Sequence, residues 1–124
     1  MLFTHEIGSE NYDQTLKDHN IVILDFWAPW CGPCRAFGPI FEKVASRHTD
    51  VFFGKVNTEN EQLLSSILNI RSIPTIMIFR DNIPVFSQAG MLPEAGLEDL
   101  IQKIKNLDME EIKTKLSSKP SMTV

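Results

Sequence analysis

The sequence lacks the features that mark several large classes of protein. It has no apolar run long enough to cross a bilayer. Its first residues carry no basic region followed by an apolar stretch, so we expect no signal peptide. Basic residues are the minority, with 12 Lys and Arg against 16 Asp and Glu, and give no electrostatic footprint for nucleic acid. These absences predict a soluble cytoplasmic protein that binds neither membrane nor nucleic acid.

Cysteine is also scarce, because the chain contains two, Cys31 and Cys34, within the stretch F-W-A-P-W-C-G-P-C-R. A structural zinc site needs four ligands, and we expect no metal. The histidines have no paired spacing, and we expect ordinary surface residues at His5, His19 and His48. A permanent disulfide across so short a loop would stabilise little, and the cytosol keeps thiols reduced. A reversible dithiol is the interpretation that remains.

Strand and helix patterns alternate along the 124 residues, which suffice for one domain with a core. The strand patterns occupy residues 2–7, 21–27, 51–56, 75–80 and 84–89. Helix patterns begin near Ser9, after the cysteines, after Thr58 and after Pro93. The last two strands are joined by a turn at Asp81 and Asn82, which predicts a hairpin. The order predicts an α/β fold, with a mixed sheet and helices on both faces.

Cap residues give more specific expectations for the helices. Ser9 is a candidate cap for the first helix. Thr58 and Glu61 match a T-x-x-E capping box ahead of a helix, and Asp108 with Glu111 predicts another. Pro39 lies inside the helix that follows the cysteines and should kink it. The helix after the first box carries four apolar residues, Leu63, Leu64, Ile67 and Leu68.

The start of the helix after the cysteines explains how the two thiols would differ. The strand ends at Trp27, so Cys31 lies at the mouth of this helix, with Gly32 and Pro33 in its first positions. The amides there have no partner within the helix, so Pro33 loses no hydrogen bond. The same free amides and the helix dipole favour a thiolate on Cys31. Cys34 should be more buried, which makes Cys31 the attacking thiolate and Cys34 the resolving thiol.

The motif W-A-P-W-C-G-P-C-R resembles the active site of the thioredoxin family. The resemblance extends over about residues 3–107 and includes L-D-F-W-A, G-K-V-N, I-R-S-I-P-T and the A-G before the last long helix. It implies a thioredoxin fold, with a central mixed sheet of about five strands flanked by about four helices. We expect a thioredoxin domain over residues 1–107 and a C-terminal extension over 108–124, forming a short helix and/or a disordered tail.

The resemblance also implies roles for individual residues. Asp25 resembles the buried acid that helps to deprotonate the resolving cysteine; the alternative is a solvated aspartate. Lys55 resembles the lysine near that acid, where the residue alone would suggest a solvated surface lysine. Pro74 resembles the cis-proline that faces the cysteines. The residues between the cysteines, Gly32 and Pro33, resemble the pair that sets the family's redox poise, here toward reduction.

The docking surface is implied in the same way. Trp30, Ile73, Gly90 and Met91 resemble the apolar rim on which partner proteins bind. In the family, the backbone at Ile73 pairs with an extended substrate segment, a mode that depends little on sequence. Apolar residues scattered over a surface are common, however, and these four would fit that description too.

The implied function is protein-disulfide reduction, with a dithiol electron carrier serving cell redox homeostasis. No cofactor would be bound, because electrons would come from NADPH through a thioredoxin reductase. The other partners would be disulfide-containing client proteins, and we expect a monomer. The alternative is a binding or chaperone subunit that uses the same docking face and has incidental redox chemistry. Thr58 and Asn82 depart from the residues usual in the family, and neither departure touches the cysteines.

Overall fold

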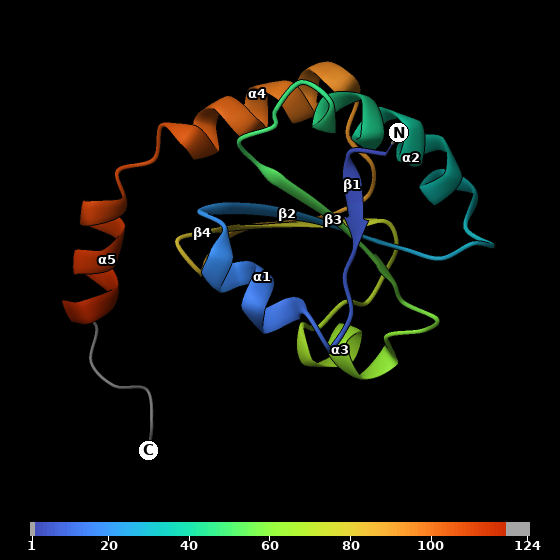
Figure 1. Cartoon of the computed structure of the whole chain (residues 1–124), viewed down its shortest axis with the longest axis horizontal. Helices are drawn as coiled ribbons and strands as arrows, with labels where there is room; N and C mark the ends of the chain where they lie inside the picture. Colours follow the sequence, from blue (N-terminus) through green and yellow to red (C-terminus); the bar gives the residue numbers. More distant parts are fainter. Residues whose placement is uncertain (1, 119–124) are drawn as a thin grey trace.

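The structure is a computed structural model, and it describes residues 2–118. The strands are β1 Thr4–Glu6, β2 Ile21–Trp27, β3 Phe52–Asn57, β4 Thr75–Arg80 and β5 Ile83–Ala89. The helices are α1 Tyr12–Asp18, α2 Gly32–Ala45, α3 Gln62–Ile67, α4 Glu94–Lys105 and α5 Met109–Ser118. The strand order is β1-β3-β2-β4-β5, in which β1 and β2 run parallel to β3 and β4 runs antiparallel to both β2 and β5. Helices α2 and α4 lie along one side of the sheet, and α1 and α3 lie along the other (Figure 1).

Strand β2 lies at the centre of the sheet, as its continuous apolar run predicts. The six residues 21–26 are buried, because β2 pairs with β3 on one side and with β4 on the other. Alternate side chains enter different cores, with Ile21 and Ile23 among the residues of α2 and α4. Val22 and Leu24 enter the core on the opposite face. The alternation directs Asp25 toward the face that α2 covers.

The hairpin of β4 and β5 forms where the sequence places it. Asp81 and Asn82 have φ angles of 53° and 65°, so both central residues of the turn are left-handed. This is the geometry of a type I′ turn, which asparagine and aspartate tolerate because their short side chains hydrogen-bond locally. The strand predicted over 2–7 is shorter than expected and covers Thr4–Glu6.

Two of the predicted helix caps are wrong. Helix α1 begins after Asn11, and the amide of Ser9 donates to the Glu61 carboxylate at 2.9 Å. The same contact removes Glu61 from a capping box, because its side chain reaches across to the loop before α1. Thr58 donates its hydroxyl to the carbonyl of Trp27 at 3.2 Å instead of capping α3.

Helix α3 is also shorter than its apolar pattern suggests. Of its six residues Leu64 is the apolar one that is buried in the core, and the C-cap residue Leu68 is partly buried beside it. Leu63 and Ile67 lie on the outer side, each with 70% of its surface exposed. Apolar content alone therefore did not identify the inner face of this helix.

Helix α5 follows the expected second cap. The Asp108 carboxylate accepts a hydrogen bond from the Glu111 amide at 3.1 Å, three residues into the helix. Met109 is buried, and Lys113 forms an ion pair with Asp81 of the hairpin turn at 2.9 Å. The short helix expected in the C-terminal extension is therefore α5, which runs to Ser118. The expectation of a disordered tail falls on residues 119–124, outside the described residues.

The histidines divide into two groups. His5 and His19 are exposed, and both contact the ring of Phe52, His5 in a stacked and His19 in a tilted arrangement. His48 is buried, so the expectation of a surface residue is wrong there. Its Nε2 lies 3.0 Å from Glu98, and its Nδ1 lies 3.1 Å from the Lys105 ammonium. Both of these partners belong to α4, so His48 helps to join the end of α2 to that helix.

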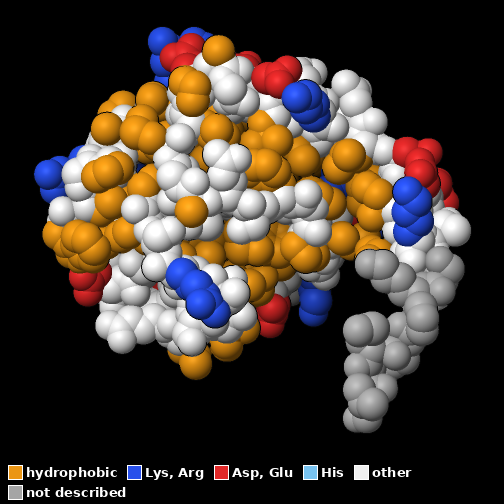
Figure 2. All heavy atoms as spheres, turned by 180° about the vertical axis from the view of Figure 1, so that it is seen from behind, with side chains coloured by type: hydrophobic (Ala, Val, Ile, Leu, Met, Phe, Trp, Pro, Cys, Tyr) orange, Lys and Arg blue, Asp and Glu red, His pale blue; other side chains and the backbone are white. Residues whose placement is uncertain are grey.

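Seen from behind, the molecule has hydrophobic side chains across the middle of its surface, with Lys, Arg, Asp and Glu mostly toward the margins (Figure 2). None of the helices in residues 2–118 combines the length and the apolar character that a membrane span requires.

Candidate active site

The two cysteines lie where β2 passes into α2. Cys31 is the N-cap residue of α2, and its Sγ accepts a hydrogen bond from the amide of Cys34 at 3.2 Å. The two sulfurs form a disulfide with the Cα atoms 5.2 Å apart. Pro33 occupies the second helical position, where its missing amide hydrogen costs no intrahelical bond. The helix start is therefore the one that the sequence predicts.

Burial separates the two cysteines only slightly in this oxidised state. Cys31 is 5% exposed and Cys34 is 3% exposed. Gly32 and Pro33 between them are exposed, as are Pro29 and Trp30 before them. The hydrogen bond at the helix start distinguishes the sulfurs more clearly, because the amide of Cys34 is directed at the sulfur of Cys31. A negative charge on Cys31 would be stabilised by this amide and by the helix dipole.

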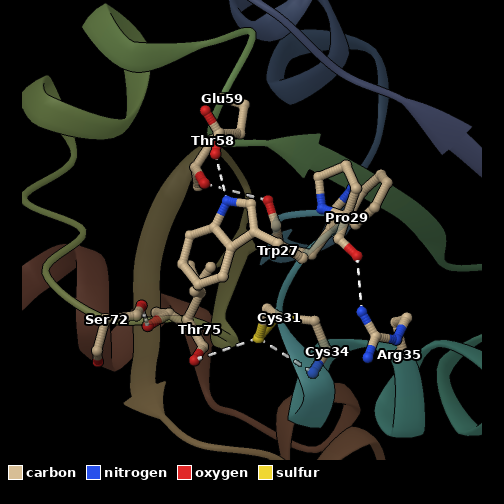
Figure 3. The surroundings of a disulfide bond; sticks show 11 residues. Trp27, Pro29, Cys31, Cys34, Arg35, Thr58, Glu59, Ser72 and Thr75 are labelled. Atoms are coloured by element: carbon tan, nitrogen blue, oxygen red, sulfur yellow. Dashed lines mark hydrogen bonds between the residues drawn. A yellow bond between two sulfur atoms is a disulfide. The ribbon is translucent and has the colours of Figure 1, made fainter.

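The segment before β4 faces the cysteines. The Ile73–Pro74 peptide bond is cis, as the resemblance implies, and the carbonyl oxygen of Ile73 lies 3.8 Å from the Sγ of Cys31. The Thr75 hydroxyl donates to the carbonyl of Ser72 at 2.7 Å and braces this segment. Figure 3 shows Ser72 and Thr75 on one side of the cysteines. The backbone of Ile73 is therefore close to the sulfur that a client would reach.

Asp25 is fully buried, and neither carboxylate oxygen has a hydrogen-bond partner in residues 2–118. Burial raises the pKa of this carboxyl from 3.8 to about 7, and the positive charge of Lys55 partly opposes the shift. Asp25 and Lys55 are register partners on adjacent strands. The Lys55 ammonium lies 4.7 Å from the centroid of the Trp27 ring, a cation–π arrangement. Asp25 can thus hold or release a proton near neutral pH.

The expected docking rim is exposed in part. Trp30 has 66% of its surface exposed, and its indole N–H donates to the Glu59 carboxylate. Met91 is 39% exposed, and the preceding Gly90 has a φ of 94°, where a side chain would be strained. The amide of Gly90 donates to the carbonyl of Pro74 at 2.8 Å, which places the two candidates next to each other.

A groove of about 210 Å³ lies between Trp30 and Ile73. Its other lining residues are Thr58, Ser65, Ile70, Arg71 and Ser72. Sequence reasoning missed Glu59 and Arg71 at this site. Their neighbours in the chain carry no pattern that indicates a contact with Trp30 or with the groove, since both contacts depend on how the chain folds.

The described residues contain no cluster of three or more His, Cys, Asp or Glu side chains arranged to hold a metal ion. The candidate site therefore consists of the cysteine pair, the buried carboxyl of Asp25 and the segment around the cis bond.

Comparisons with known proteins agree with this geometry. The thioredoxin family model matches residues 3–103. A putative thioredoxin 2 of Streptomyces coelicolor is 50% identical over 113 residues, which cover 91% of this chain and 84% of that protein. Thioredoxin 1 of Synechococcus elongatus is 43% identical over 99 residues, which cover 78% of this chain and 92% of that protein.

Solved structures give the same result. A mutant thioredoxin from Halobacterium salinarum has a TM-score of 0.77 at 33% identity, covering 84% of this chain and 91% of its own. A thioredoxin of Plasmodium falciparum has a TM-score of 0.74 at 28% identity, and the match covers 81% of this chain and 97% of that one.

The fold, the cysteine pair and the relatives lead to one conclusion. The five-stranded mixed sheet flanked by helices is the thioredoxin fold. The cysteines at disulfide distance give it dithiol–disulfide chemistry. Proteins of this family carry no bound cofactor, and their partners are in general a reductase and disulfide-containing clients. The chain belongs to the thioredoxin family, as a protein-disulfide oxidoreductase.

Proposed function

We propose that the protein is a general reductant of protein disulfides, in which Cys31 attacks the client and Cys34 releases it. The observation that carries this proposal is the position of Cys31 at the N-cap of α2, where its sulfur accepts the amide of Cys34. A thiolate, rather than a thiol, is the nucleophile in disulfide exchange. The helix start favours a thiolate on Cys31. No backbone amide in residues 2–118 is recorded as donating to the sulfur of Cys34.

The reaction transfers two electrons in two exchanges. The Cys31 thiolate attacks one sulfur of the client disulfide, so a Cys31–client bond forms and the client's other sulfur leaves as a thiolate. Cys34 then loses its proton and attacks the sulfur of Cys31. The Cys31–client bond breaks, the second client sulfur leaves, and the protein is left with the Cys31–Cys34 disulfide that the structure contains.

We assign the proton of Cys34 to Asp25. Its unpaired buried carboxyl has a pKa raised to about 7, so near neutral pH it is partly ionised and can accept a proton. Lys55, its neighbour across the sheet, offsets part of the cost of that charge. Asp25→Asn should therefore slow resolution of the mixed disulfide much more than the initial attack, as measured by stopped-flow kinetics.

Clients would dock on the rim formed by Trp30, Ile73, Gly90 and Met91, with Pro74 beside it. Support comes from the exposure of Trp30 and Met91 and from the nearness of the Ile73 carbonyl to the Cys31 sulfur. An extended client segment that pairs with the backbone at Ile73 would bring its own sulfur close to Cys31.

The remaining parts of the proposal concern the setting of the reaction. The oxidised pair would be reduced by NADPH through a thioredoxin reductase, and Gly32 with Pro33 would favour the reducing direction. We further propose a cytoplasmic monomer with a thioredoxin domain over residues 1–107. Residues 108–124 would then be an extension, which either has no function or makes a client-selective or assembly contact.

Insulin reduction coupled to NADPH and a thioredoxin reductase tests the proposed function. Turnover in the wild type and none in Cys31→Ser is the expected result. Turnover no higher than that of Cys31→Ser would instead favour the alternative, a binding or chaperone subunit that uses the same docking face.

A further inference from the structure

The groove between Trp30 and Ile73 borders the sulfur that the client reaches. The Ile73 carbonyl on its wall lies 3.8 Å from the Cys31 Sγ. A client segment that pairs with the Ile73 backbone would thus place a side chain near the attacked cysteine in or beside this groove. Most of the groove's lining is uncharged, and Arg71 is the lining residue with a full charge.

Arg71 is oriented by one hydrogen bond, which leaves the two terminal nitrogens of its guanidinium without a recorded partner among the described residues. Its Nε donates to the Oδ1 of Asn69 at 3.1 Å, and the side chain is exposed. Within residues 2–118, no carboxylate is recorded at ion-pair distance from Arg71. The two terminal nitrogens thus remain available, and a guanidinium binds a carboxylate through two parallel hydrogen bonds.

The position of Asn69 is fixed by the end of α3. Asn69 has a φ of 61°, and its amide donates to the carbonyl of Ser66, while that of Ile70 donates to Ser65. These two bonds form a Schellman motif, in which the left-handed residue closes the helix. The backbone of Asn69 is therefore restrained, and its side chain restrains Arg71 in turn. An oriented arginine loses less conformational entropy on binding than a free one.

Two other charged side chains near the cysteines, Glu59 and Arg35, have partners within the protein. The Glu59 carboxylate accepts the indole N–H of Trp30. The Arg35 guanidinium donates to the carbonyl of Pro29 at 3.0 Å, on the opposite side of the cysteines from Ser72 and Thr75 (Figure 3). The full charge among the groove's lining residues is the positive charge of Arg71, on a chain whose formal net charge is −4.

We propose that Arg71 is a specificity-determining residue, which favours clients with an aspartate or glutamate one or two residues from the attacked cysteine. The proposal rests on the proposed attack by Cys31, because that attack fixes where the client lies. A carboxylate in this position would meet the free end of the guanidinium as the client segment pairs with Ile73. Asn69 is a positioning residue that acts through Arg71.

A series of synthetic peptides with one internal disulfide tests this. Each carries Glu or Gln at position −2, −1, +1 or +2 from the attacked cysteine and is otherwise identical. Pre-reduced protein is mixed with each peptide, and the second-order rate of peptide reduction is measured by mass spectrometry at low and high salt. No reductase is present, so changes in reductase binding do not enter.

The wild type should reduce the Glu peptide faster than its Gln partner at one or more positions, by about three- to fivefold at low salt, the range of an exposed ion pair. High salt should lower this ratio. In Arg71→Gln the ratio should fall to about one. Arg35→Gln is the matched control, because it removes another positive charge beside the cysteines and should keep the ratio.

Asn69→Gly tests the positioning role, since glycine keeps the left-handed backbone and removes the acceptor of Arg71. If Asn69→Gly has a lower ratio of Glu-peptide to Gln-peptide reduction rates than the wild type, the role is supported. An unchanged rate ratio overturns it. The same Glu-to-Gln ratio in the wild type and in Arg71→Gln at every position would overturn the proposal for Arg71. If the wild type reduces none of the peptides, or Cys31→Ser reduces them as fast, the proposed function itself is wrong.

Discussion

Asp25 shows how one residue combines a structural cost with a chemical use. The sequence places it in a run of Val, Ile, Leu and Phe, and from that run we could predict its burial. The structure adds that both carboxylate oxygens lack a partner among the described residues. An unpaired buried carboxylate is destabilised by desolvation, so its pKa rises to about 7. Its proton affinity thus suits exchange with a thiol at neutral pH.

The stability of the protein should report this pKa directly. The folded pKa of about 7 exceeds the ordinary value of 3.8, so between these pH values the folded state binds more protons than the unfolded state. The free energy of unfolding therefore falls as pH rises through this window. Asp25→Asn removes the effect, and it should be more stable than the wild type above pH 7, by up to about 4 kcal/mol.

The measurement is urea unfolding of the oxidised protein between pH 4 and pH 8, in which the cysteines do not titrate. The advantage of Asp25→Asn should be smallest near pH 4 and should grow with pH. A stability difference that stays constant over this range would show that Asp25 does not have a raised pKa.

Other residue roles could not be predicted, because they depend on partners far away in the chain. The sequence predicts a surface residue at His48, yet Glu98 and Lys105 of α4 bind its two ring nitrogens. Glu59 reaches Trp30, 29 positions before it. No periodicity or local motif encodes such pairs. The roles of the cysteines, Gly32 and Pro33 were easier to predict, because the motif that indicates them consists of four consecutive residues.

At the scale of elements, the sequence predicts helix starts well where the cap is local. Asp108 caps α5 through an amide three residues ahead, and Cys31 does the same for α2. The prediction failed at α3, where Glu61 is drawn away to Ser9 across the molecule. The carboxylate of a capping box can bind another donor that the fold brings near, as Glu61 binds the Ser9 amide. The sequence alone does not show which distant donor this will be.

The end of α4 depends on one arginine from the sheet. Arg80 Nη1 donates to the carbonyl of Ile104 at 2.7 Å, with longer contacts to those of Lys105 and Leu107 at 3.2 and 3.4 Å. The carbonyls of Ile104 and Lys105 lie in the last turn of α4, where the helix supplies no further amides, and that of Ile104 also accepts the Leu107 amide at 3.3 Å. Arg80→Met should therefore lower the free energy of unfolding by about 1–3 kcal/mol.

Urea unfolding measures this change as a lower midpoint concentration. Arg47→Met is the control, because Arg47 is an exposed arginine that pairs with Glu94 at the start of α4. Its loss should shift the midpoint much less. Equal shifts for the two variants would mean that the carbonyl contacts of Arg80 contribute no more than a surface ion pair.

At the scale of the whole molecule, the order of strands and helices was enough to predict the fold class. The apolar run of β2 gave the central strand, and the hairpin turn gave the antiparallel edge. The sequence did not reveal how α5 attaches. Its contacts include the buried Met109 and the ion pair between Lys113 and Asp81, at the turn between β4 and β5.

If residues 108–124 form an extension without a catalytic role, a chain ending at Leu107 should keep its activity. We expect insulin reduction within about twofold of the full chain, with lower thermal stability because the contacts of Met109 are lost. Lys113→Met in the full chain is the milder companion, since it removes the ion pair alone. A large loss of turnover in a truncated chain that is still folded would assign the extension a part in client or reductase binding.

The order of the two cysteines is the central claim of this account. Its most direct test is mass spectrometry of mixed disulfides formed with insulin by Cys34→Ser and by Cys31→Ser. We predict that Cys34→Ser accumulates a stable mixed disulfide on Cys31, because no resolving thiol remains. Cys31→Ser should accumulate little or none. Accumulation mainly in Cys31→Ser, with the client bound through Cys34, would contradict the account.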